Sequence, residues 1–331
     1  MTACTHCGVT SVSYNSCRNR HCPKCQVTNK ERWIIDRESE LLPVPYYHIV
    51  FTLPHHFNEL LPKYDKELYS TLFAASWKTI QTFADDPKWL GAKTGMVSIL
   101  HTWGQQLWLH PHLHCIVPGG GITPYGKWKH CKHKGKYLFP KRAMSTVFRA
   151  KFMALLRKKM DIPQHIAGKV FKTKWVVYAK RPFASPKTVV EYLGRYTHKV
   201  AISNHRLVDL NDKTVSFQYK DYRDAGKKKI VTLSGVEFLR RYSAHILPSG
   251  FVRIRHYGFL ASRNKPSELN IAKRHFQQPL WVKVKYSWAE IAKDRLNFNP
   301  HRCPHCKQDR MIIIKVINPE RGPPENKFFH D

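Results

Sequence analysis

Cysteine pairs at metal-ligand spacing open the chain. Cys4 and Cys7 form one CxxC pair, and Cys22 and Cys25 form a second. Each pair presents two thiolates at a fixed distance, and two such pairs can close on one tetrahedral zinc ion. We therefore predict that these four cysteines bind a structural Zn²⁺ ion.

Other cysteines and histidines leave alternatives open. Cys17 and His21 lie between the two N-terminal pairs, where they either bind a second zinc ion or are ordinary buried or solvated residues. Cys303 and Cys306 form a third CxxC pair, which is half of a zinc site. This pair joins Cys131 or His130 from elsewhere in the fold, bridges two chains through a metal, or stays without metal. Spacing alone does not choose among these.

A second kind of metal site is predicted by the sequence HPHLHC at residues 110–115. His112 and His114 flank Leu113 in a predicted strand, so alternation directs both imidazoles to one face and Leu113 into the core. Two imidazoles on a rigid strand can chelate a divalent cation, but they need a third ligand. His110 shares their face and is the candidate. Alone, a His-apolar-His pattern often arises by chance.

Two tyrosines suggest a nucleophile. Tyr192 and Tyr196 lie four residues apart in a helix predicted over 186–198, so both phenols share one face. Such an aromatic pair more commonly packs on a core. Here Arg195 and Lys199 place phosphate-binding groups on the same helix.

The elements that position these residues are mixed strands and helices without strict alternation, which predicts an α+β sheet domain. The predicted strands are 46–53, 99–108, 112–117 and 174–178, with a hairpin at 214–220 and 229–233. The predicted helices are one or two in 57–84, and one each at 144–159, 186–198 and 236–246.

The predicted domain order follows from these elements. A zinc-binding module at 1–30 and a linker helix at 31–45 precede a catalytic domain at 46–210. A hairpin and helix at 211–263 are expected to bind DNA, and a basic tail with the third CxxC pair occupies 264–331.

The charge of the chain calls for a polyanionic partner. Lys and Arg number 56 against 23 acidic residues, so the net charge is 56 − 23 = +33. Nucleic acid is the expected partner, with a ribosome-associated or membrane-surface protein as the alternatives. We expect Arg18, Arg20, Arg195 and Lys199 to contact DNA. Nine cysteines, with no signal peptide and no membrane span, favour metal binding in a reducing cytoplasm.

Five segments together resemble one protein family. They are SYNSCRNRHCPKCQ (13–26), FTLPHH (51–56), HPHLHCIVPGGGI (110–122), YLGRYTHKVAISNHRL (192–207) and GFVRIRHYGFLA (250–261). These are similar to transposases of the ninety-one family of bacterial insertion sequences. That family consists of rolling-circle enzymes of the HUH class, in which HUH stands for histidine, hydrophobic residue, histidine. The first segment resembles that family's zinc-binding domain. The family usually has a longer segment before the first CxxC pair.

The resemblance implies a function. His112 and His114 match the family's metal-binding pair, which would hold Mg²⁺ or Mn²⁺, and Tyr192 and Tyr196 match its two nucleophile positions. The expected fold is an HUH endonuclease core, a ferredoxin-like or palm-like antiparallel sheet with helices, plus a small zinc-ribbon-like module. The expected activity is nicking and rejoining of single-stranded DNA at transposon ends and target DNA through a 5′-phosphotyrosine intermediate. A plasmid- or phage-type replication initiator and a non-enzymatic zinc-containing nucleic-acid-binding protein are the alternatives.

Overall fold

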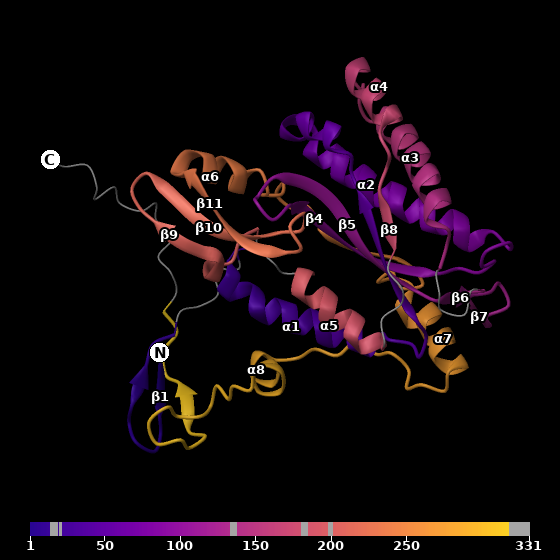
Figure 1. Ribbon diagram of the computed structural model, residues 1–331. Coiled ribbons are helices and arrows are strands. Elements are labelled where there is room, and N and C mark those ends of the chain that lie inside the picture. The colour runs from indigo at the N-terminus through magenta and orange to yellow at the C-terminus, as the bar shows by residue number, and fades with distance from the viewer. Residues whose placement is uncertain (14–18, 20–21, 133–137, 180–184, 198–200, 318–331) are drawn as a thin grey trace. The chain divides into compact units, whose positions relative to one another are not determined.

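A computed structural model describes residues 1–13, 19, 22–132, 138–179, 185–197 and 201–317 (Figure 1). The chain divides into two compact units. The larger unit spans residues 20–284 and contains a five-stranded sheet with helices against both faces. The smaller unit combines residues 1–19 with the chain from residue 285 onward. Each unit therefore has its own packing.

The central sheet of the larger unit is antiparallel throughout. Its strand order is β12-β4-β5-β3-β8, so β5 lies in the middle. The bounds are β3 Tyr46–Thr52, β4 Gly95–Trp103, β5 Leu109–Pro118, β8 Val177–Ala179 and β12 Ile254–Gly258. The strands predicted at 46–53 and 112–117 are confirmed as β3 and β5, which pair with each other inside the sheet.

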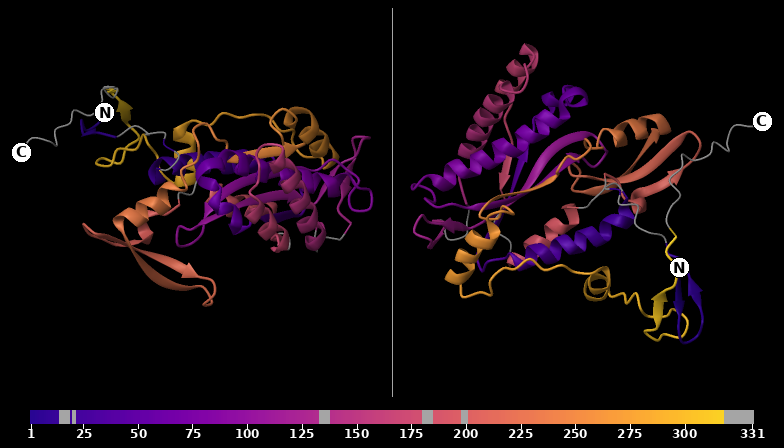
Figure 2. Two further views of the ribbon diagram at one scale, coloured as in Figure 1. Left: turned by 90° about the horizontal axis from the view of Figure 1, so that it is seen from above. Right: turned by 180° about the vertical axis from the view of Figure 1, so that it is seen from behind.

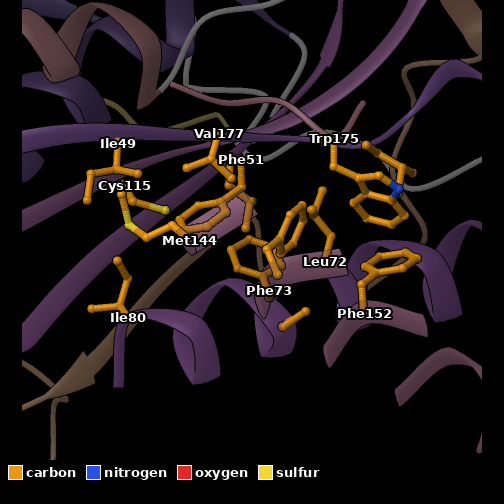
Figure 3. Close-up of a cluster of buried hydrophobic side chains, with 14 of the residues drawn as sticks. Ile49, Phe51, Leu72, Phe73, Ile80, Cys115, Met144, Phe152, Trp175 and Val177 are labelled. Atoms are coloured by element: carbon orange, nitrogen blue, oxygen red, sulfur yellow. The ribbon is translucent and has the colours of Figure 1, made fainter. Parts of the chain in front are cut away.

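One face of the sheet packs on α2 (Leu61–Asp85) and α3 (Lys141–Arg157), which lie side by side (Figure 2). Alternate strand residues such as Phe51 and Leu113 point into this core, and both are fully buried. Figure 3 shows Phe51 among side chains from both helices, including Phe73 and Phe152. Burial of one such side chain contributes roughly 1.5–3 kcal/mol. This core therefore holds β5 rigidly from one side.

The opposite face carries a second core and the histidines described below. It packs on α1 (Pro23–Ser39) and α5 (Pro186–Thr197), which contact each other, and on α7 (Asn270–His275). Gly194 of α5 lies at the helix contact, where an added Cβ would lie 2.5 Å from Ile34 Cδ1 of α1. A larger residue there would force the Ile34 side chain to shift.

A smaller antiparallel sheet forms the third core of the larger unit. Its order is β11-β10-β9, and helix α6 follows β11 in the chain. The bounds are β9 Leu207–Leu210, β10 Thr214–Asp221, β11 Lys227–Ser234 and α6 Gly235–Ser243. The predicted hairpin and the helix after it are confirmed. Ser234 caps α6 by accepting from the Glu237 backbone N–H.

The remaining elements of the larger unit are short. They are the hairpin β6 (Gly120–Ile122) and β7 (Trp128–His130), helix α4 (Gln164–Lys172), the 3₁₀ helices η1 (His55–Glu59) and η2 (Asn204–Arg206), and the π-helical turn η3 (Lys265–Leu269). Within the described residues, no helix is both long enough and apolar enough to cross a membrane.

The smaller unit joins the two ends of the chain in one sheet. Strand β13 (Met311–Ile313) pairs with β1 (Thr2–Cys4), which pairs in turn with β2 (Thr10–Ser11). Helix α8 (Trp288–Leu296) begins with a capping box in which Ser287 and Glu290 bond reciprocally.

The α+β class with antiparallel sheets agrees with the prediction, but several boundaries differ. Helix α1 begins at Pro23, inside the segment predicted as the zinc module. The strand predicted over 99–108 runs from Gly95 to Trp103 and then turns. Residues 1–19 belong with the chain beyond residue 284, so the 1–30 segment is not a separate unit.

Candidate metal and nucleophile site

Three histidines from two adjacent strands converge on the α5 face of the central sheet. His112 and His114 come from β5, and His101 lies opposite His112 in β4. One ring nitrogen from each of the three lies within 4.8 Å of the others. His112 Nε2 and His114 Nε2 are 3.1 Å apart. Three imidazole nitrogens at this spacing on paired strands can hold one divalent cation.

Local contacts prepare His112 of strand β5 as a metal ligand. His112 Nδ1 donates to the His110 carbonyl oxygen at 2.6 Å. A carbonyl can only accept, so Nδ1 carries the proton and Nε2 keeps its lone pair. Burial lowers the pKa of His112 to about 4, so its imidazole is neutral near pH 7. A neutral imidazole with a free Nε2 lone pair is the form that binds a metal.

The third histidine of the cluster is not the one predicted from the sequence. His110 lies on β5 but is exposed, and it is not a member of the cluster. It contributes its backbone carbonyl instead. His101, which the sequence analysis missed, takes the third position and is buried. A signal existed, because a hairpin turning at 104–108 places His101 opposite His112.

Tyr192 lies on the same face of the sheet as the histidines. The helix predicted over 186–198 is confirmed as α5, and Ser185 Oγ accepts from the Thr188 N–H at its start. The Tyr192 ring meets the His48 ring edge-on with centroids 5.6 Å apart. His48 Nε2 lies 2.8 Å from His114 Nδ1. A single chain of contacts therefore links the helix to a candidate metal ligand.

Other predicted residues lie outside the described part of the chain or lack a described side chain. Tyr196 is in α5 one turn beyond Tyr192, and its side chain is not described. The four predicted DNA contacts belong to the same group: Arg18, Arg20, Arg195 and Lys199. These roles remain predictions.

Side chains from the part of the chain that builds the third core hold the turn between β4 and β5 by hydrogen bonds. Arg206 donates to the Gln105 carbonyl, Arg241 to the Gln106 carbonyl at 3.2 Å, and His245 Nε2 to the Leu107 carbonyl at 3.0 Å. Leu107 has a φ of 62°, which costs a branched residue about 1–3 kcal/mol. Its burial in the third core offsets that cost. The strands that carry His101 and His112 are therefore joined by a fixed turn.

Four cysteines form a second candidate metal centre, in the smaller unit. They are Cys4, Cys7, Cys303 and Cys306, and their sulfurs all lie within 4.8 Å of one another. This corrects the prediction that Cys4 and Cys7 share a site with Cys22 and Cys25. Cys22 is instead the N-cap residue of α1 in the larger unit, and Cys25 lies in the first turn of that helix. The predicted second site at Cys17 and His21 lies outside the described residues.

Comparison with protein-family models gives two matches. Residues 95–267 match a model described as "Putative transposase", which covers β4, β5 and α5. Residues 1–53 match a model described as "Transposase zinc-binding domain". The second match and the four-cysteine cluster both indicate zinc. No solved structure matches the chain.

Two curated relatives match along most of the chain. One is "Putative transposase y4qJ" of Sinorhizobium fredii, which is 40% identical over 97% of this chain and 86% of the relative. The other is "Transposase for insertion sequence element IS801" of Pseudomonas savastanoi, at 29% identity over 92% of this chain and 76% of the relative. These matches and the two family models show that the chain belongs to the IS91 family of insertion-sequence transposases.

Proposed function

We propose that this transposase has an HUH-type core that nicks and rejoins single-stranded DNA at the element ends with a tyrosine nucleophile. The observation that carries the proposal is the convergence of His101, His112 and His114 on the sheet face where Tyr192 packs. Tyr192 and Tyr196 are the two nucleophiles. The third cluster ligand is His101.

The chemistry follows from the charge of the substrate. A phosphodiester repels nucleophiles, and a Mg²⁺ or Mn²⁺ ion at the three histidines would polarise a non-bridging oxygen and offset the developing charge. Histidine ligation favours Mn²⁺ or a softer ion over Mg²⁺. The Tyr192 oxygen loses its proton to solvent and bonds to phosphorus, while the bond to the 3′ oxygen breaks. The 3′ oxygen takes up a proton, which leaves a 5′-phosphotyrosine link and a 3′-hydroxyl.

The phosphotyrosine link makes the reaction reversible. Because the bond energy is conserved, a 3′-hydroxyl of another strand can attack the link and release the tyrosine without ATP. The partners are therefore single-stranded element ends and target DNA in the bacterial cytoplasm. The net charge of +33 supports binding of both.

One experiment tests this function directly. The full chain is incubated with labelled single-stranded element ends and Mn²⁺, and the products are separated under denaturing conditions. We expect a labelled band that migrates with the protein, together with a free 3′-hydroxyl fragment. A water-using nuclease would cut without forming the band. A binding protein would do neither, and a replication initiator would form the band on a plasmid or phage origin but not on these ends.

A further inference from the structure

The four cysteines of the smaller unit form two matching turns. Cys4 N–H donates to the Val9 carbonyl and Gly8 N–H donates to the Cys4 carbonyl. In the second turn, Cys303 N–H donates to the Gln308 carbonyl and Lys307 N–H donates to the Cys303 carbonyl. The residue after the second cysteine has a positive φ in both turns, 73° at Gly8 and 62° at Lys307. The two ends of the chain thus fold into equivalent knuckles.

The sulfurs of the two knuckles have the spacing of a tetrahedral zinc site. Cys4 Sγ lies 3.6 Å from Cys306 Sγ, and Cys7 Sγ lies 3.6 Å from Cys303 Sγ. Four thiolates at about 2.3 Å from one zinc ion are about 3.8 Å apart. The sulfurs are too far apart for disulfides, and all four cysteines are free. The donor set therefore fits zinc.

The backbone brings the knuckles together. β1 and β13 pair antiparallel, with Cys4 opposite Met311, and Thr5 N–H donates to the Arg310 carbonyl at 3.0 Å. Cys4, Cys303 and Met311 form a small buried cluster of their own. So small a core needs a metal to hold it.

We propose that Cys4, Cys7, Cys303 and Cys306 bind one zinc ion together, so that the zinc-binding domain is completed by the far end of the chain. The family model of that domain matches only residues 1–53. The other two ligands of this site, Cys303 and Cys306, lie about 250 residues beyond the end of that match. The N-terminal segment alone therefore lacks two ligands.

Zinc stoichiometry of the full chain tests this proposal. Zinc per chain is measured for the wild type and for three variants. One double variant carries Cys4→Ser and Cys7→Ser, the other carries Cys303→Ser and Cys306→Ser, and the quadruple variant carries all four changes. One shared ion predicts that each double variant loses about one zinc and that the quadruple variant loses no more. Cys131→Ser is the control, because Cys131 contacts Tyr47 Oη in the larger unit and should lose none.

The pattern of losses separates the alternatives. If the C-terminal double variant keeps its full zinc content, Cys4 and Cys7 bind zinc with other ligands and the proposal fails. If the quadruple variant loses twice as much as either double variant, the two pairs belong to separate sites. Neither outcome depends on DNA cleavage, so it leaves the proposed function untouched.

A separate observation concerns His48, which belongs to no predicted site. His48 is buried in β3, and its Nε2 lies 2.8 Å from His114 Nδ1. His114 Nε2 faces His112 Nε2. For His114 to offer its Nε2 lone pair to a cation, its proton must sit on Nδ1 and be donated to His48 Nε2. The His48 ring also meets the Tyr192 ring edge-on.

We infer that His48 is a positioning residue that fixes the tautomer and ring orientation of His114. The inference rests on the proposed function only in taking the histidine cluster as a cation site. Loss of such a partner typically weakens metal binding about 10- to 100-fold. Because His48 acts through Nε2, the side chain that replaces it must place an acceptor at that position.

Mn²⁺ binding to the full chain without DNA, measured by electron paramagnetic resonance, tests the inference. His48→Leu should weaken binding about 10- to 100-fold. His48→Gln places an oxygen near the Nε2 position and should bind within a few-fold of wild type, whereas His48→Asn places it near Nδ1 and should bind like His48→Leu. His165→Leu is the control, because His165 is exposed and pairs with Glu59. The melting temperature of each variant reports folding.

Two results would overturn the role of His48. One is a wild-type Mn²⁺ affinity in His48→Leu, and the other is an equal loss of Mn²⁺ affinity in His48→Gln and His48→Asn. Either result would show that His48 only packs against its neighbours and does not position His114. If Mn²⁺ binding depends on His48 but no covalent adduct forms with wild type, the positioning role stands and the proposed nicking does not.

Discussion

A His112→Ala protein is expected to form no covalent adduct with single-stranded element ends and to transfer no strand. His112 Nε2 lies 3.1 Å from His114 Nε2, so its removal opens the cation site that both steps need. Loss of about 4 kcal/mol of charge stabilisation corresponds to a decrease in cleavage rate of about 10³-fold. The rate of adduct formation in Mn²⁺ measures it.

Two neighbouring histidines give matched controls for this result. His101→Ala should reproduce the loss, because His101 belongs to the cluster. His110→Ala should cleave within a few-fold of wild type, because His110 contacts His112 through its backbone carbonyl, which alanine keeps. The opposite result is loss of cleavage in His110→Ala and normal cleavage in His101→Ala. It would support the ligand set predicted from the sequence and refute the set seen in the structure.

The two tyrosines are expected to differ in effect. Tyr192→Phe removes the phenol oxygen from the ring beside His48 and should abolish the adduct. Tyr196→Phe should still nick but fail to complete strand transfer. One helical turn separates the two α-carbons by about 6 Å, so the tyrosines cannot reach one phosphate equally well. Separate assays for the adduct and for joined strands distinguish the two steps.

A phenylalanine substitution at an exposed site controls for general effects. Tyr125 lies in the turn between β6 and β7 and is 89% exposed, so Tyr125→Phe should cleave and transfer like wild type. Cleavage and transfer at wild-type rates in Tyr192→Phe would show that Tyr192 is a core aromatic. In that case its contact with His48 would serve packing only.

The features that were predictable from the sequence are local ones. The alternation in HPHLHC places Leu113 in one core and His112 and His114 on the other face, and the structure has that arrangement. The period of a strand depends only on backbone geometry, so a single strand is enough to predict it. The helix with Tyr192 was also predictable locally, because Ser185 and Pro186 are residue types that favour the start of a helix.

The features that were missed depend on pairing between distant segments. His101 and His48 reach the site because of the registers of β4 and β3 with β5. The strand predicted to Trp108 was too long because Leu107 adopts a positive φ, which its packing in the third core and the His245 hydrogen bond stabilise. Without the turn there, the register of His101 could not be derived.

The cysteine pairs show a similar limit. All three CxxC pairs are chemically equivalent, and short spacing favours joining Cys4 and Cys7 to the pair that follows them. The pairing of β1 with β13 instead brings Cys4 and Cys7 next to Cys303 and Cys306. This pairing depends on contacts between two segments that are far apart in the sequence. Local spacing carries no information about that contact.

The four-cysteine cluster gives the polypeptide the connectivity of a ring. Cys7 and Cys303 are 296 residues apart, and the whole larger unit lies in the segment between them. As long as the proposed zinc ion stays bound while the larger unit unfolds, the unfolded segment is a closed loop with fewer conformations than a linear chain. Loop-closure entropy then stabilises the folded state by on the order of 5 kcal/mol. The larger unit is in effect an insertion in a metal-closed loop, so an ion bound by the smaller unit would help to keep the larger unit folded.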